Sequence, residues 1–145
     1  MSTLNSPEMM RAVIMDHYEY PRNKKLKGEV GYLKVHMDSE SCIDDIYIEA
    51  LIENGIIKVV CFDGIGCTFS TASTSIMSEL MKDKTIEEAQ KIIDNYLKMI
   101  NMEEYDEDLL EEAVVFQNTG RQANRIKCAT IGWNGMQELI DMSKK

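Results

Sequence analysis

The sequence predicts an α+β fold, a three-stranded antiparallel sheet with helices packed on one face, in a single domain spanning residues 1–145. Three observations support this prediction. Strand-like alternation of apolar and polar residues occurs only in the first half of the chain. From residue 70 onward, apolar residues recur at helical spacing. The chain has 145 residues, which is enough to bury one hydrophobic core.

The predicted sheet is built from three segments in sequence order. A weak strand covers residues 32–37, and a clearer one covers residues 46–53, where apolar side chains occupy alternate positions. Asn54-Gly55 follows, and this pair favours a β-hairpin because a type I′ turn needs positive φ at both central residues. Residues 56–62 then form the return strand. These segments predict an antiparallel sheet.

Helices are predicted before and after these strands. Ser6 and Pro7 are typical of an N-cap and a first helical position, and Pro21 ends this first helix by residue 20. Thr85 begins a capping box, because a glutamate lies three residues later. The later segments are a helix over 70–81, a helix over 85–100, a short helix within 103–112, a loop over 120–124 and a last helix over 129–142.

Charge and composition exclude several classes of function. The net charge of −9 argues against binding to nucleic acid and to anionic membrane surfaces. The sequence has no run of 18 apolar residues and does not start with a secretory signal, so we expect a cytoplasmic protein. In a reducing compartment its four cysteines are metal ligands, reactive thiols or core residues rather than disulfides.

One short segment runs against the acidic composition. Residues 21–28 carry a cluster of lysine and arginine. We interpret this basic loop either as a solvated turn or as a docking contact for an acidic partner.

Cys67 occupies the most informative position in the sequence. The strand pattern ends at Phe62, Gly64 and Gly66 allow a tight turn, and a cluster of serines and threonines then begins a helix. Cys67 therefore lies just ahead of a helix N-terminus, where free N–H groups and the helix dipole favour a thiolate. A small buried hydrophobic residue is the alternative interpretation.

Three further residues are candidates to join Cys67 at one metal ion. Cys42 and Cys128 lie at predicted junctions between loops and regular elements, and Asp44 lies two residues after Cys42. Three thiolates and one carboxylate form a ligand set that zinc accepts tetrahedrally, and thiolates also bind copper(I) and iron–sulfur clusters. The spacing alone leaves buried cysteines as an equal alternative. Cys61 lies inside the return strand, on the face of Ile57 and Val59, so we expect a core residue.

The same residues carry a resemblance to a known family. Residues 62–73 resemble the second-cysteine motif of the SufU/IscU family, the NifU N-terminal-like proteins of iron–sulfur cluster assembly. Residues 13–23 resemble the N-terminal helix and loop of that family. Residues 125–130, with Trp133, resemble its third-cysteine motif, and Cys42-Ile43-Asp44 resembles the first motif, usually Cys-Gly-Asp.

Within this family the sequence is similar to the SufU branch. Cys67 and Cys128 are 61 positions apart (128 − 67), which is typical of the insertion in that branch, and Lys127 replaces the histidine common in scaffold members. The resemblance implies a zinc-bound sulfurtransferase that takes persulfide sulfur from a PLP-dependent, SufS-like cysteine desulfurase and passes it to downstream cluster-assembly proteins. It implies that Cys42 is the persulfide acceptor.

Several alternatives remain open at this stage. Arg125 and Lys127 are candidates to stabilise thiolate charge at Cys128, or they are ordinary solvated cations. The four ligand residues would equally serve a scaffold that holds a [2Fe–2S] cluster. An adaptor with buried cysteines and no metal is the third possibility. Ile43 stands where the family usually has glycine, so the loop of Cys42 and Asp44 is expected to take a different path. The two histidines, His17 and His36, are expected to be structural.

Overall fold

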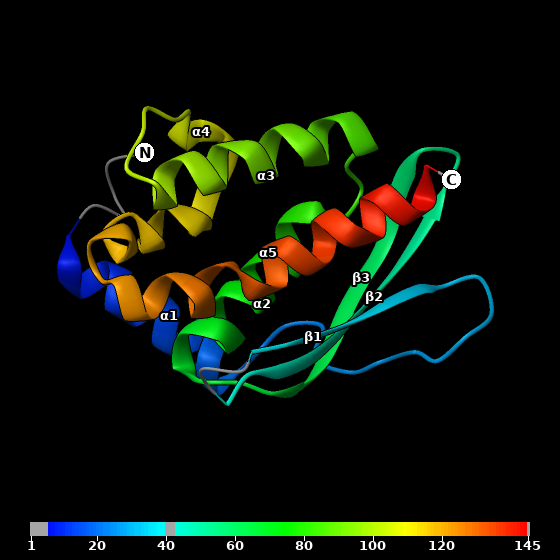
Figure 1. The fold of residues 1–145 in the computed structure, drawn as a ribbon, viewed down its shortest axis with the longest axis horizontal. Helices are drawn as coiled ribbons and strands as arrows, with labels where there is room; N and C mark the ends of the chain where they lie inside the picture. The colour runs from blue at the N-terminus through cyan, green and yellow to red at the C-terminus, as the bar shows by residue number, and fades with distance from the viewer. Residues whose placement is uncertain (1–5, 40–42, 145) are drawn as a thin grey trace.

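A three-stranded antiparallel sheet and the helices that cover it confirm the predicted α+β class (Figure 1). The structure is a computed structural model that describes residues 6–39 and 43–144. The strands are β1 (Leu33–Asp38), β2 (Asp45–Glu53) and β3 (Ile56–Ile65), in the order β1-β2-β3. The helices are α1 (Pro7–Glu19), α2 (Thr68–Met81), α3 (Ile86–Ile100), α4 (Glu107–Leu110), the 3₁₀ segments η2 (Glu111–Phe116) and η3 (Thr119–Arg121), and α5 (Ala123–Ser143).

The predicted hairpin joins β2 and β3. Asn54 and Gly55 have φ values of 53° and 75°, so both central residues are left-handed as a type I′ turn requires. Beyond the turn the register shifts between Leu51 and Ile52, because Ile52 pairs with Ile57 whereas Leu51 pairs with Val59. Lys58 is therefore the extra residue of a β-bulge.

The bulge corrects one sequence-based expectation about Cys61. Ile57 belongs to the hydrophobic core under the helices, together with Val60 and Phe62. Cys61 pairs with Glu49 on the opposite face of the sheet, so it shares a face with Val59 but not with Ile57. It is nevertheless buried, because the segment after α1 crosses this outer face and the Lys27 backbone N–H donates to Glu49 Oε1 at 2.8 Å.

Helix α2 lies at the centre of the molecule and is lined by hydroxyl groups. Of its 14 residues, 11 are buried, and six of these are serine or threonine. Trp133 Nε1 donates to Ser73 Oγ at 2.9 Å, and the Trp133 ring stacks on Tyr96 with centroids 3.9 Å apart. Burial raises the pKa of Tyr96, whose hydroxyl donates to Ala129 O at 2.7 Å. These contacts tie α2 to α3 and α5.

Two helices begin earlier than the sequence pattern predicts. Helix α2 starts at Thr68 with Cys67 as its N-cap, and β3 continues to Ile65 rather than stopping at Phe62. Helix α5 starts at Ala123 rather than Ala129. Its N-cap, Gln122, makes no side-chain capping hydrogen bond, so the sequence carries no start signal there. Cys128 therefore lies within α5 and not in the loop before it.

The two histidines each contact other side chains of the fold. His17 is buried, with Nδ1 2.8 Å from Ser75 Oγ and Nε2 2.8 Å from Glu112 Oε1. His36 stacks on the Tyr47 ring, with centroids 4.3 Å apart. Among the described residues, no helix has the length and hydropathy needed to cross a membrane.

Candidate metal centre

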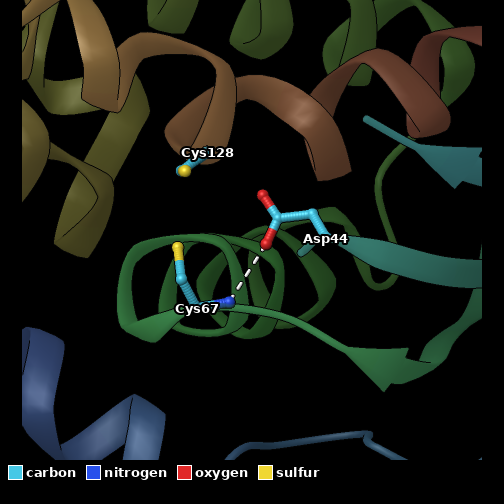
Figure 2. A group of neighbouring side chains, drawn as sticks. All are labelled: Asp44, Cys67 and Cys128. Carbon is cyan, nitrogen blue, oxygen red and sulfur yellow. Dashed lines mark hydrogen bonds between the residues drawn. The ribbon is translucent and has the colours of Figure 1, made fainter. Parts of the chain in front are cut away.

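Three of the four predicted ligands converge in space. One donor atom from each of Asp44, Cys67 and Cys128 lies within 4.8 Å of the other two. Figure 2 shows the three side chains facing a common space, from the start of β2, the start of α2 and the first turns of α5. The fourth predicted ligand, Cys42, lies outside the described residues, so its position remains a prediction.

The local backbone at the end of β3 places the Cys67 sulfur. Cys67 caps α2, and the Ser70 N–H donates to its Sγ at 3.5 Å, so the sulfur lies at the positive end of the helix. Gly64 lies within β3 opposite Ile46, where its φ is +128° and a Cβ would lie 2.2 Å from Asp45 O, so glycine allows the two strands to pair closely here. The predicted passage from strand to helix is present, but it is confined to Gly66 and Cys67, and the helix terminus is directed at the thiol.

Asp44 is the most constrained group of the site. It is 2% exposed, and its Oδ1 accepts a hydrogen bond from the Cys67 backbone N–H at 3.0 Å (Figure 2). The same oxygen accepts a hydrogen bond from Ser70 Oγ at 2.7 Å. A buried carboxylate with two donors on one oxygen is held in one orientation. Ile43, which precedes it, is 65% exposed, so the bulky side chain points to solvent while Asp44 still reaches the site.

Ser70 contacts the site, whereas the sequence predicted for it only a potential role as a helix cap. Its side chain is fully buried, and its hydroxyl supports Asp44 from a position 26 residues away in sequence. The serine and threonine cluster marks this region as polar and helical. No sequence signal assigns one of its hydroxyls to an aspartate that lies just before β2.

Cys128 reaches the site because α5 packs closely on α2. Gly132, one turn after Cys128, lies so near Thr74 that a Cβ would be 2.3 Å from Thr74 Oγ1. Only glycine allows this approach of the two helices that carry the sulfurs. Cys128 itself is 6% exposed, compared with the intermediate exposure of Cys67.

The two predicted cations point in different directions. The Arg125 guanidinium carbon lies 4.7 Å from the centroid of the Phe69 ring, next to the first turn of α2. Lys127 is exposed and lines a pocket of about 320 Å³ with residues of β1 and α5, including Asp38 and Thr130. The structure therefore brings Arg125 to the helix that carries Cys67 and leaves Lys127 on the β1 side of Cys128.

Cys61 is not part of this centre. It lies against Glu49 on the outer face of the sheet, and burial raises its pKa to about 11. A thiol with this pKa stays protonated near neutral pH, whereas metal ligands are thiolates. Cys61 is therefore buried, as predicted, but on the outer face of the sheet and not in the core under the helices.

The donor chemistry fits a soft or borderline metal ion. Two sulfurs and a carboxylate are ligands that zinc accepts, and Zn–S bonds of about 2.3 Å place tetrahedral donors about 3.8 Å apart. Separations of up to 4.8 Å are therefore within about an ångström of a ligating arrangement. Iron–sulfur clusters use the same thiolate donors, so the donor set alone does not select between the two.

The fold and the site together define a class of small α+β proteins that bring two cysteines and an aspartate to one metal-sized space. Residues 9–141 match the family described as NifU-like N terminal domain, and the chain belongs to this family of iron–sulfur cluster assembly proteins.

Individual relatives are similar over nearly the whole chain. The chain is 33% identical to the zinc-dependent sulfurtransferase SufU of Bacillus subtilis (strain 168), covering 94% of this chain and 92% of that protein. It is 32% identical to the iron–sulfur cluster assembly scaffold protein IscU of Streptococcus pyogenes serotype M1, covering 99% and 88%. A crystal structure of a proposed iron–sulfur cluster assembly scaffold protein for the SUF system from Fervidobacterium islandicum AW-1 superposes with a TM-score of 0.81, at 25% identity, covering 96% and 98%.

Proposed function

We propose that this protein is a zinc-dependent sulfurtransferase that accepts persulfide sulfur from a PLP-dependent cysteine desulfurase. The observation that carries the proposal is the convergence of Asp44, Cys67 and Cys128 donor atoms within 4.8 Å. The similarity to SufU over 94% of the chain and the presence of Lys127 where scaffold members commonly carry histidine both support it.

The residues expected to hold the zinc ion are Cys42, Asp44, Cys67 and Cys128. Bound zinc would keep the cysteine sulfurs deprotonated at neutral pH. The chain itself orients the remaining donors. The Ser70 hydroxyl and the Cys67 N–H fix the Asp44 carboxylate, and the N-terminus of α2 faces the Cys67 sulfur.

Cys42 is the proposed acceptor. Its thiolate attacks the terminal sulfur of the desulfurase persulfide, a new S–S bond forms on Cys42, and the desulfurase cysteine leaves as a thiolate. No external oxidant is needed, because the sulfane sulfur is transferred at its existing oxidation level. Arg125, which lies over the Phe69 ring, and Lys127 are close to Cys128 in sequence, and both are proposed to favour negative charge on the sulfurs during transfer.

Desulfurase turnover tests this proposal directly. We expect the wild-type protein to accelerate cysteine consumption by the partner desulfurase, and Cys42→Ala to abolish the acceleration. Cys61→Ala is the matched control, because it also removes one cysteine but lies outside the metal centre. Equal acceleration by wild type and Cys42→Ala would show that the acceptor assignment is wrong.

A scaffold that carries a [2Fe–2S] cluster is the second candidate, favoured by the 32% identity to an IscU over 99% of the chain. The same four residues would hold the cluster. Anaerobic reconstitution with iron and sulfide separates the two functions. A stable cluster that absorbs visible light and transfers to an acceptor protein would favour the scaffold, whereas zinc retention without cluster formation would favour sulfur transfer.

A further inference from the structure

A second candidate site lies at the far end of α2 from the metal centre. A pocket of about 260 Å³ opens there, surrounded by the side chains of Lys25, Lys27, Lys58 and Lys82. These lysines come from three separate parts of the chain, which are the loop after α1, the bulge of β3 and the C-cap of α2. Only folding brings them together. Since α2 rises about 1.5 Å per residue, Cys67 and Lys82 lie about 22 Å apart along the helix.

The charge of this pocket contrasts with that of the chain. No carboxylate lines the pocket, although the net charge of the protein is −9. Within residues 6–39 and 43–144, none of the four ammonium groups forms an ion pair. The nearest basic neighbour in sequence, Lys24, is paired with Asp63 at 2.9 Å and does not line the pocket. The four ammonium groups are therefore not paired with carboxylates of the described residues, although Glu79 accepts a hydrogen bond from Asn23, and Glu49 accepts hydrogen bonds from the Lys27 N–H and from Cys61, three residues that line the pocket.

The other residues that line the pocket are Asn23, Ser78 and the β3 residues Val59, Val60 and Cys61. Val60 and Cys61 are each 2% exposed, so their side chains are almost closed to a ligand. Asn23 Nδ2 donates to Ser78 Oγ at 2.9 Å and to Glu79 Oε2 at 3.1 Å, and Ser78 Oγ donates to Ser75 O at 2.7 Å. A ligand would therefore meet chiefly the four exposed lysines.

We propose that this lysine pocket docks an acidic peptide segment of a partner protein. A lysine ammonium is a mobile point charge and does not form the bidentate contact that recognises a single oxyanion. Several lysines are therefore better suited to binding several carboxylates along a flexible chain. The pocket is also smaller than the roughly 300–1,000 Å³ typical of small-molecule sites. On a protein of charge −9, a local basic patch is where an acidic partner is attracted and oriented.

This proposal is independent of the metal chemistry, so the two can fail separately. The test uses the full chain loaded with zinc and a short fluorescein-labelled polyglutamate peptide, and fluorescence anisotropy measures the binding. We expect saturable binding that weakens as salt is added. The double reversal Lys58→Glu/Lys82→Glu should lower the affinity by about tenfold.

A matched control separates the pocket from general charge effects. Lys91→Glu/Lys98→Glu makes the same change in net charge at two exposed positions of α3, away from the pocket. We expect this variant to keep affinity within about twofold of the wild type. All four lysines are exposed, so both double variants should fold, which circular dichroism will verify.

Three results would overturn the proposal. The first is that the peptide does not bind saturably to the wild type. The second is that both double variants lose the same amount of affinity for the peptide. The third is that inorganic phosphate displaces the peptide when its concentration equals that of the peptide's carboxylates. The last result would assign the pocket to a small oxyanion instead. Chemical-shift changes at the amides of Val59 and Val60 on peptide addition, absent in Lys58→Glu/Lys82→Glu, would support docking at this pocket.

Discussion

The backbone N–H of Cys67 donates a hydrogen bond of 3.0 Å to Asp44 Oδ1, so one candidate ligand residue orients another. The same oxygen accepts the Ser70 hydroxyl at 2.7 Å. Both donors come from the first turn of α2 and its cap, which also direct the helix N-terminus at the Cys67 sulfur. The carboxylate and this sulfur are therefore arranged by one structural element, and the site depends on groups beyond the ligands themselves.

Removing the Ser70 hydroxyl should weaken metal binding without removing a ligand. We expect Ser70→Ala to lower zinc affinity by about tenfold or more, because Asp44 loses a support that fixes its orientation. Competition with a chromophoric chelator measures this change. Ser78→Ala is the matched control, since Ser78 is also a buried α2 serine but lies at the opposite end of the helix. Equal zinc affinities of the two variants would show that the Ser70 contact does not matter for the site.

Placing a methyl group between α2 and α5 should disturb both the core and the centre. Gly132→Ala would bring a Cβ within 2.3 Å of Thr74 Oγ1, so we expect a loss of about 1–3 kcal/mol in the free energy of unfolding. Adding Thr74→Ala should restore part of this loss, because it removes the hydroxyl and methyl that clash. Urea denaturation measures both variants, and the absence of any rescue in the double variant would contradict this packing account.

Cys61 should behave as an inert thiol in the folded protein. Burial raises its pKa to about 11, so only about one molecule in a thousand carries the thiolate at pH 8. We expect iodoacetamide to leave Cys61 unmodified in the native, zinc-free protein while it alkylates Cys67, which is partly exposed. Peptide mass spectrometry gives the result. Unfolding in urea is the control and should make Cys61 reactive, whereas rapid native alkylation of Cys61 would contradict its burial.

Glu112 should contribute stability that disappears in acid. The hydrogen bond from His17 lowers the pKa of Glu112 below its ordinary value of 4.5 in spite of partial burial. A carboxyl with a lower pKa in the folded state stabilises the protein above its unfolded pKa, and this contribution is lost as pH falls through the folded pKa. The stability difference between wild type and Glu112→Gln should therefore be full above about pH 5.5 and shrink on acidification.

Urea midpoints measured across this pH range test the Glu112 prediction. Glu104→Gln removes the same charge at an exposed position and controls for the change in net charge. A stability difference that grows as the pH falls, or one that Glu104→Gln reproduces, would contradict the role assigned to the contact with His17.

Sequence analysis succeeded where the signal is local. Asn54-Gly55 predicts its own turn, and the residues around Cys67 predict a strand, a tight turn and a helix start, because each depends on backbone preferences within a few residues. The strand order and the helical covering follow from the same local patterns.

The remaining features depend on tertiary contacts that no local pattern encodes. The early start of α5 was missed because Gln122 provides no side-chain cap. The bulge at Lys58, which moves Ile57 to the helix side of the sheet, depends on how β2 and β3 pair. The hydrogen bond from Ser70 to Asp44 joins residues 26 positions apart, and it became visible only once β2 and α2 were placed together.

Zinc K-edge X-ray absorption on protein purified without a metal-affinity tag tests the central claim most directly. The account predicts one zinc ion per chain with three sulfur ligands at about 2.3 Å and one oxygen ligand, and a loss of that oxygen in Asp44→Ala. A zinc shell made only of nitrogen and oxygen, or full zinc occupancy with unchanged sulfur ligation after Cys67→Ala, would contradict it.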